Sequence, residues 1–345
     1  MRSRVHDMAA FMLLLVVALA TAAYARAAPG DASNTYDAST KGPVPIPPAE
    51  RDLHTVLAEP WLKVSEEGLA LEGPAFDRAG NLLFLEIYGG RVFKVDADKR
   101  LTTLIAKNDI VPAGLAIHKD GRIFLAGVGN LKTGGSVIAF SPDGERRQTI
   151  LPKEAGYLVD DLVFDHRGGF YFSDFKGSAT QPDGGVYYAS ADHKTITPVL
   201  PHLAVANGVA LSPDGKYLWV TEFSRNLLYR VQLVDATTVP PLGTAVAYQF
   251  TGPYPDSLRV DADGNVYAAM YEQGRVLIFN PHGMPIGQIL VPGREKGHFL
   301  RTTSLAIKPG TNEVYIVASD GDAGQGAMIF RAPGFAQAHL LYSHQ

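Results

Sequence analysis

Residues 207–222 read NGVALSPDGKYLWVTE: an apolar stretch, a Ser-Pro-Asp-Gly turn and a second apolar stretch that ends on an acidic residue. Related stretches begin at five other positions, which are Glu72, Ala113, Asp160, Asp256 and Thr303. From Glu72 to Thr303, successive first positions lie 41, 47, 47, 49 and 47 residues apart by the numbering. A strand-turn-strand repeat with a period near 45 is typical of a β-propeller with one blade per repeat. The sequence therefore predicts an all-β fold, a six-bladed β-propeller.

Further strands follow the repeated hairpins. The turns include Asp120-Gly121, Asp214-Gly215 and Asp263-Gly264, which are strong hairpin signals between alternating strands. A third strand is readable in most repeats, as in GGRVFKVD (89–96) and GRVLIFN (274–280). No stretch keeps a 3.6-residue apolar period, so we expect very little helix. We expect the stretch Trp61–Val64 to join the last blade, because a closed ring leaves no free sheet edge.

The N-terminus has the order of a secretory signal peptide. Arg2 and Arg4 precede an apolar run from residue 8 to residue 23, and Ala25-Arg26-Ala27 follows it. We predict a signal peptide over residues 1–27, cleaved after Ala27, with an uncleaved anchor as the alternative. Residues 28–60, rich in Pro, Ala, Ser and Asp, are predicted as an extended N-terminal segment. The propeller is predicted to span residues 61–345.

Charge and cysteine content indicate which partners and which cellular compartment to expect. The chain has a net charge of −4, and residues 28–345 carry 28 basic and 34 acidic side chains, a net charge of −6. A mildly acidic surface without basic clusters argues against a nucleic-acid partner, and against a membrane partner once the signal is removed. The chain has no cysteine, so neither disulfides nor lipoprotein acylation are expected. These features predict a periplasmic or secreted protein; the sequence leaves the oligomeric state open.

The first position of each repeat predicts a metal site on the propeller axis. The strands that begin each blade surround a central channel, so equivalent residues converge there. Glu72, Asp160 and Asp256 bring three carboxylates to this position, and Asn207 adds an amide oxygen. Carboxylates that close cannot all stay ionised unless a cation or a proton lies between them. The alternative is that each carboxylate only caps its own strand.

An all-oxygen ligand set indicates which cation to expect. Calcium is the first choice, with magnesium or manganese as alternatives. Zinc is retained as a further alternative, although it prefers nitrogen and sulfur ligands. A bound cation polarises a carbonyl group and lowers the pKa of water. Asp256, in the turn Tyr254-Pro255-Asp256-Ser257, is the expected catalytic residue that accepts or donates the proton.

Other residues have weaker claims to a role in the site. Asp161 follows Asp160 and should point to the opposite side of its strand by simple alternation. His298 and Arg301 follow a Pro-Gly pair and are candidates for the substrate pocket, with a plain surface role as the alternative. The sequence contains no Gly-x-Ser-x-Gly elbow and no His-Glu-x-x-His pair.

Several stretches resemble a known family. EGPAFD, DDLVFD, ANGVALSPDGKYLWVTE and PDSLRVDADGNVYAAMYEQGRV resemble the senescence marker protein/gluconolactonase/luciferin-regenerating enzyme-like family over roughly residues 55–345. GGFYFSDFKG, GGVYYAS and VPGREKGHFLRTT are similar to its calcium-dependent drug-responsive lactonase branch. The resemblance implies a six-bladed propeller that hydrolyses a lactone with a central divalent metal. It implies metal ligation by Glu72, Asp160, Asn207, Asp256 and Ser257, with Asp256 as proton donor.

These observations together predict a metal-dependent lactonase acting on a small-molecule lactone. Sugar lactones, aromatic lactones such as dihydrocoumarin, and lactones from plant catabolism are all open as substrates. Two alternatives remain from the sequence: a phosphotriesterase-like hydrolase that uses the same cation, and a non-catalytic propeller that serves as a binding platform. The three carboxylates at one register position favour an enzyme, because a binding platform has no need of them.

Overall fold

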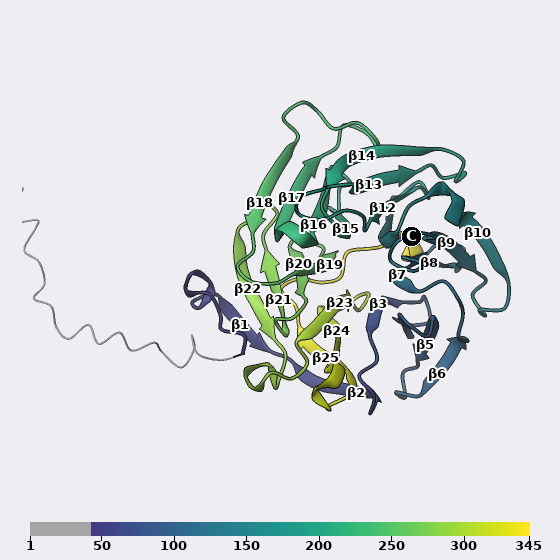
Figure 1. Cartoon of the computed structure of the whole chain (residues 1–345). Coiled ribbons are helices and arrows are strands. Elements are labelled where there is room, and N and C mark those ends of the chain that lie inside the picture. Colours follow the sequence, from purple (N-terminus) through teal and green to yellow (C-terminus); the bar gives the residue numbers. More distant parts are fainter. Residues whose placement is uncertain (1–42) are drawn as a thin grey trace, which may run out of the picture. The chain divides into compact units, whose positions relative to one another are not determined.

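Six sheets surround a central axis in the computed structural model of the chain, which describes residues 43–345 (Figure 1). The predicted signal peptide (1–27) and the first part of the predicted extended segment (28–42) lie outside the described residues. Residues 43–345 form strands joined by turns and single 3-10 turns, with no α-helix among them. The predicted all-β, six-bladed propeller is confirmed.

The inner two strands of each blade are the hairpins that the repeat predicted. The innermost strands are β3 (Leu71–Phe76), β7 (Pro112–Ile117), β11 (Val159–Phe164), β15 (Ala206–Leu211), β19 (Pro255–Val260) and β23 (Arg301–Ile307). The second strands are β4 (Leu82–Glu86), β8 (Ile123–Gly127), β12 (Phe170–Asp174), β16 (Tyr217–Glu222), β20 (Val266–Met270) and β24 (Glu313–Ser319). Each innermost strand packs against the innermost strands of the two neighbouring blades, so together they line the axis.

The outer strands complete six antiparallel sheets. The third strands are β5 (Arg91–Val95), β9 (Ser136–Phe140), β13 (Gly184–Ala189), β17 (Leu227–Gln232), β21 (Arg275–Phe279) and β25 (Ala327–Pro333). The outermost strands of blades one to five are β6 (Leu101–Ile105), β10 (Arg147–Leu151), β14 (Ile196–Leu203), β18 (Thr244–Gln249) and β22 (Pro285–Leu290). The 3-10 turns are η2 (Pro48–Glu50), η3 (Lys153–Ala155), η4 (Phe223–Arg225), η5 (Arg294–Lys296), η6 (Gly321–Ala323) and η7 (Tyr342–His344).

The N-terminal part of the described chain closes the ring. β2 (Glu59–Ser65), which includes the stretch Trp61–Val64, pairs antiparallel with β25 and becomes the outermost strand of the sixth blade. The predicted closure is therefore confirmed. β1 (His54–Leu57) pairs parallel with β22 and adds a fifth strand to the fifth blade. The described part of the predicted extended segment, residues 43–60, thus contributes β1 and the first residues of β2 to the propeller.

Apolar side chains between neighbouring blades form the core. Strands such as β20 and β21 are buried along their whole length, because each blade has another blade on both of its faces. One cluster joins Tyr267 and Ile278 of the fifth blade to Leu305, Ile316 and Phe330 of the sixth. None of the described residues forms a helix long and apolar enough to cross a membrane.

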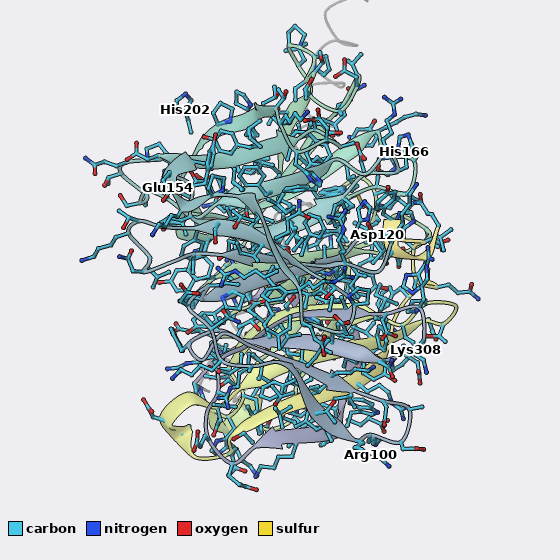
Figure 2. The ribbon with its side chains drawn as sticks, turned by 90° about the vertical axis from the view of Figure 1, so that its right-hand side faces the viewer. Arg100, Asp120, Glu154, His166, His202 and Lys308 are labelled. Atoms are coloured by element: carbon cyan, nitrogen blue, oxygen red, sulfur yellow. The ribbon has the colours of Figure 1, made fainter. Side chains whose placement is uncertain are left out.

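The disc has two distinct faces, which Figure 2 shows from the side. Glu154 and His202 project from one face, called here the Glu154 face, whereas Asp120, His166 and Lys308 project from the other, called here the His166 face. Glu154 and His202 precede innermost strands β11 and β15, and His166 lies in the turn that follows β11. The first position of each repeat therefore lies toward the Glu154 face.

Candidate active site and metal centre

A break in strand register marks the site in every blade. In β11, Val159 pairs with Asp174 and Leu162 pairs with Phe172, so Asp160 and Asp161 together oppose Ser173. The innermost strands of the other five blades show a register shift at the corresponding place. Such bulges re-aim side chains beside functional sites. The simple alternation expected for Asp160 and Asp161 is interrupted here, and both side chains are buried.

The four predicted oxygen ligands are buried at this level of the channel. Glu72, Asp160, Asn207 and Asp256 are only 3–7% exposed, and each comes from a different innermost strand. Ser257, assigned as a further ligand by resemblance, follows Asp256 in the bulge of β19 and is also buried. Ala113 and Thr303 complete the ring, and the Thr303 hydroxyl donates a hydrogen bond to the Leu71 carbonyl at 2.7 Å.

The carboxylates act on one another electrostatically. Burial, followed by the charges of Asp256 and Asp160, raises the pKa of the Glu72 carboxyl well above its usual value. Burial and the charge of Asp160 likewise raise the pKa of Asp256, while a hydrogen bond from the Asn207 side chain opposes the rise. Burial and the charge of neighbouring Asp161 raise the pKa of Asp160. The site therefore favours a proton or a cation over three free negative charges.

One buried oxygen in this group lacks a hydrogen bond. Oδ1 of Asn207 has no hydrogen-bond partner among residues 43–345. A buried acceptor left unsatisfied costs roughly 1–3 kcal/mol. A cation on the axis would satisfy this oxygen and neutralise the carboxylates around it, so the residues present fit a hard, oxygen-seeking metal ion.

The carboxylates do not form a ligand group by themselves. Within the described part of the chain, no three His, Asp or Glu side chains lie close enough together to hold a metal ion. A cation held on the axis would therefore need the amide oxygen of Asn207 in its shell, together with carboxylates from at least two blades. This requirement agrees with the unpartnered state of that oxygen.

Four aromatic side chains cluster where the second strands of three blades end, at the same end of the blades as the carboxylates. The rings of Phe223 and Tyr254 stack with centroids 4.5 Å apart and an interplanar angle of 13°. Phe175 and Tyr271 each lie 6.0 Å from Phe223. Burial raises the pKa of the Tyr271 hydroxyl, to which the charge of Asp256 also contributes. These four side chains, called here the aromatic wall, come from three blades and are half-buried.

The sequence also singled out His298, Arg301 and Asp161, and these three side chains have different surroundings in the structure. His298 is half-buried, and its Nδ1 lies 3.0 Å from Oδ2 of Asp320. Arg301 is exposed at the start of β23 and pairs with Tyr271 in an isolated β-bridge. Asp161, in contrast, is 1% exposed and forms an ion pair with Arg259 at 3.3 Å.

Sequence reasoning missed two features of the site. Arg259 lies three positions after Asp256, on a strand whose other described side chains are buried or apolar. An arginine inside a closed ring of innermost strands was a signal that could have drawn attention to it. The aromatic wall had no such signal, because its members lie in loops far apart in the sequence.

A cavity of about 560 Å³ lies at the opposite end of the channel, toward the His166 face. Its lining includes Ala116, Val163, Val209 and Arg259, and the C-terminal residues 338–345 cover it. None of the five predicted metal ligands lines this cavity. This cavity and the candidate chemistry thus occupy different ends of the channel, and the buried carboxylates identify the site.

Comparison with known proteins places the chain in a family. The sequence model of the SMP-30/gluconolactonase/LRE-like family matches residues 71–319. A protein named lactonase drp35 from Staphylococcus haemolyticus is 49% identical over 317 residues, which cover 90% of this chain and 97% of that protein. Its namesake from Staphylococcus saprophyticus is 50% identical over 303 residues, which cover 86% and 93%.

Solved structures share the fold at low identity. A calcium-binding protein, regucalcin, from Agrobacterium tumefaciens superposes with a TM-score of 0.68 at 19% identity, covering 84% of this chain and 99% of that one. A gluconolactonase from Xanthomonas campestris gives a TM-score of 0.64 at 18% identity, covering 79% and 88%. The family match over most of the propeller and the near-full-length relatives agree, and the chain belongs to the SMP-30/gluconolactonase/LRE-like family.

Proposed function

We propose that this protein is a calcium-dependent lactonase that hydrolyses the ring ester of a small-molecule lactone. The observation that carries the proposal is the group on the axis: three buried carboxylates and an unpartnered amide oxygen at one register position. Relatives that share about half of its residues over nearly their whole length are named lactonases, which supports the same reaction class.

Glu72, Asp160, Asn207 and Asp256, with Ser257 beside them, would hold the cation. Carboxylate, amide and hydroxyl oxygens favour calcium, with magnesium, manganese or zinc as alternatives. When bound, a divalent cation polarises a carbonyl oxygen and lowers the pKa of a water molecule. The buried carboxylates balance its charge, and their fixed places on separate blades set where the lactone carbonyl can lie.

Asp256 is the residue we assign to proton transfer. Hydrolysis forms a bond from the water oxygen to the carbonyl carbon and breaks the bond between that carbon and the ring oxygen. The water loses one proton, and the ring oxygen gains one. A carboxylate held at this place can accept the first proton and return one to the ring oxygen, as in other cases of general acid–base catalysis.

The aromatic wall indicates which class of lactone the site favours. Stacked Phe223 and Tyr254 present flat apolar surface beside Asp256, and Tyr271 adds to it. Such surface accommodates a planar apolar body better than a heavily hydroxylated ring, whose hydroxyl groups need hydrogen-bond partners. Among the substrates left open by the sequence, we therefore favour aromatic lactones such as dihydrocoumarin over sugar lactones.

The experiment is lactone hydrolysis by purified protein with added calcium, with chelator and with calcium restored. The panel contains dihydrocoumarin, glucono-δ-lactone and a phosphotriester. We expect dihydrocoumarin hydrolysis to disappear with chelator and return with calcium. Asp256→Asn should lower kcat/KM at least about 100-fold, the usual range for loss of a general acid–base group. Asp192→Asn, the same change on an exposed hairpin, is the matched control.

Two outcomes would redirect the proposal. Turnover of the phosphotriester alone would assign the site to phosphotriester hydrolysis. Tight calcium binding without turnover of any member of the panel would leave the propeller as a calcium-stabilised binding platform.

We also propose that the protein is exported, on the strength of the charge and hydropathy order in residues 1–27. Expression of the full chain in a Gram-negative host should yield a periplasmic protein whose mass corresponds to a start at Ala28. Recovery of the uncleaved chain from the cytoplasm would contradict this assignment.

A further inference from the structure

Asp161 stands between the candidate metal ligands without belonging to the predicted ligand set. It follows Asp160 in the bulge of β11, and its side chain is almost completely buried. On its own blade its N–H donates to Oγ of Ser173 at 3.0 Å, and its Oδ1 accepts from Leu162 N at 2.9 Å. The first contact holds the backbone of the bulge, and the second orients the carboxylate.

Oδ2 of Asp161 reaches the next two blades. It accepts a hydrogen bond from Val209 N at 3.4 Å, on β15, and one from Nη1 of Arg259 at 3.3 Å, on β19. β11, β15 and β19 are the strands that carry Asp160, Asn207 and Asp256. A single carboxylate thus links three innermost strands at places one, two and three residues after the three oxygen donors.

In the second and fourth blades, a glycine at the equivalent position allows direct backbone approach between neighbouring innermost strands. Gly114 and Gly208 follow the first position of their repeats, and a Cβ atom there would lie 2.3 Å from the Asp160 carbonyl oxygen and 2.6 Å from that of Asp256. Only glycine permits such contact. In the third blade this place is taken by Asp161, whose side chain makes the connection instead.

We propose that Asp161 is a positioning residue that, through Arg259, sets the spacing of the strands bearing Asp160, Asn207 and Asp256. The inference rests on the proposed metal site. A buried ion pair contributes little net stability over an apolar pair, but the loss of one partner leaves an uncompensated charge. The fixed geometry of the Asp161–Arg259 pair matters more here than its net stability, because oxygen donors from separate blades must meet around one ion.

A competing explanation treats the pair as charge alone. In that view Asp161 attracts a cation and Arg259 repels it, so loss of the arginine charge should tighten calcium binding. Positioning makes the opposite prediction, because loss of Arg259 frees β19 and the Asp161 side chain. The sign of the change in calcium affinity therefore separates the two explanations.

The test is calcium binding to the metal-free protein by isothermal titration calorimetry, alongside lactone kinetics. Arg259→Met should weaken calcium affinity about tenfold or more, as is usual for residues that orient metal ligands. Arg259→Lys keeps the charge but replaces the planar guanidinium, whose Nη1 donates to both Asp161 and the Leu258 carbonyl oxygen, by a compact and more strongly hydrated ammonium group. We expect it to weaken calcium binding by a smaller factor, whereas the charge explanation predicts wild-type affinity. Arg331→Met, on the outer part of the sixth blade, is the matched control.

A double-mutant cycle completes the test. Asp161→Asn should weaken calcium binding, and its combination with Arg259→Met should be no weaker than the poorer single variant. Tighter binding by Arg259→Met, or wild-type affinity in Arg259→Lys, overturns the proposal while leaving the lactonase intact. Absence of both calcium binding and hydrolysis in the wild type would overturn the proposed function, and this inference with it. If Arg259→Met does not fold, Arg259→Lys alone decides.

Discussion

The buried amide oxygen of Asn207 is the atom that most directly indicates a cation site on the axis. Its neighbours on the axis are carboxylates, which cannot donate a hydrogen bond to it while they are ionised. Oδ1 therefore has an unmet demand that a cation can satisfy and that no described residue meets.

Asn207→Ala tests this demand. Removal of the side chain deletes a proposed ligand, and the relief from its unsatisfied oxygen offsets the loss of its hydrogen bond to Asp256. We expect the melting temperature of the metal-free protein to change little, and the rise caused by calcium to be lost. Thermal melts with chelator and with calcium measure both quantities. A calcium-induced rise as large as that of the wild type would show that Asn207 is not a ligand.

Asp174, which is not a proposed ligand but pairs with Val159 next to Asp160, provides a pH prediction. Burial raises its pKa from 3.8 to about 6, although Leu158 N and Lys176 partly offset the effect. Because the folded-state pKa is raised, the stabilising contribution of the neutral acid is complete below pH 3.8. It is lost as the pH rises through 6. The difference of about two units corresponds to about 3 kcal/mol of lost stability above pH 6.

Asp174→Asn removes this titration and keeps an oxygen to accept from Leu158 N. At pH 7 the variant should be more stable than the wild type by up to about 3 kcal/mol. The advantage should vanish near pH 4. Urea unfolding at the two pH values measures the difference, and an equal difference at both would contradict the assignment.

At the scale of strands, close approach of the innermost backbones explains the glycines at the site. Gly208 has an ordinary strand conformation, yet a Cβ atom there would meet the Asp256 carbonyl oxygen at 2.6 Å. The residue is needed for space rather than for backbone freedom. β15 and β19 can therefore bring Asn207 and Asp256 together only if position 208 lacks a side chain.

Gly208→Ala should push β15 away from β19. We expect a loss of roughly 1–3 kcal/mol in stability, as for other overpacked sites, and weaker calcium binding by calorimetry. Gly80→Ala is the control, because Gly80 lies in an open turn with φ of 82°. The control should lose stability through backbone strain while calcium affinity is unchanged. If the two variants changed calcium affinity equally, the spacing of β15 and β19 would have no specific effect on the metal site.

The strands themselves were predictable, whereas their register was not. Alternating apolar residues and Asp-Gly turns gave the hairpins, and the period gave the number of blades. The bulge at Asp160-Asp161 depends on how Val159 and Leu162 pair with β12, which local pattern does not encode. For the same reason, the contact between Asp161 and Arg259, 98 residues away, could not be predicted.

The whole ring depends on segments from both ends of the described chain. Trp61–Val64 carried enough apolar character to predict closure through β2, but the parallel pairing of β1 with β22 had no sequence signal. Glu50 is a second example: it is buried and forms an ion pair with Arg275 at 2.6 Å, in a segment whose composition indicated only an extended stretch of chain. Tertiary contacts, rather than local propensity, order this segment.

The C-terminal residues cross the channel on the His166 face, as the yellow end of the chain shows in Figure 1. Arg78 donates hydrogen bonds to the carbonyl oxygens of Ser343 at 2.7 Å and Gln345 at 2.9 Å. The Tyr342 ring is buried against His118 and Phe164, with centroids 5.0 and 5.6 Å away. These contacts join the end of the chain to the first three blades.

Tyr342→Ala tests whether this segment serves stability alone. Loss of a large buried aromatic side chain typically costs about 3–5 kcal/mol, and the cavity beneath the segment allows some collapse, so we expect a cost near 3 kcal/mol. Because the proposed metal ligands lie toward the opposite face, kcat/KM and calcium affinity should be unchanged at temperatures where the variant is folded. Thermal unfolding, calorimetry and lactone kinetics on one preparation measure all three. A fall in kcat/KM with unchanged stability would mean that the two ends of the channel are coupled, most directly through Arg259, which lines the cavity and contacts Asp161.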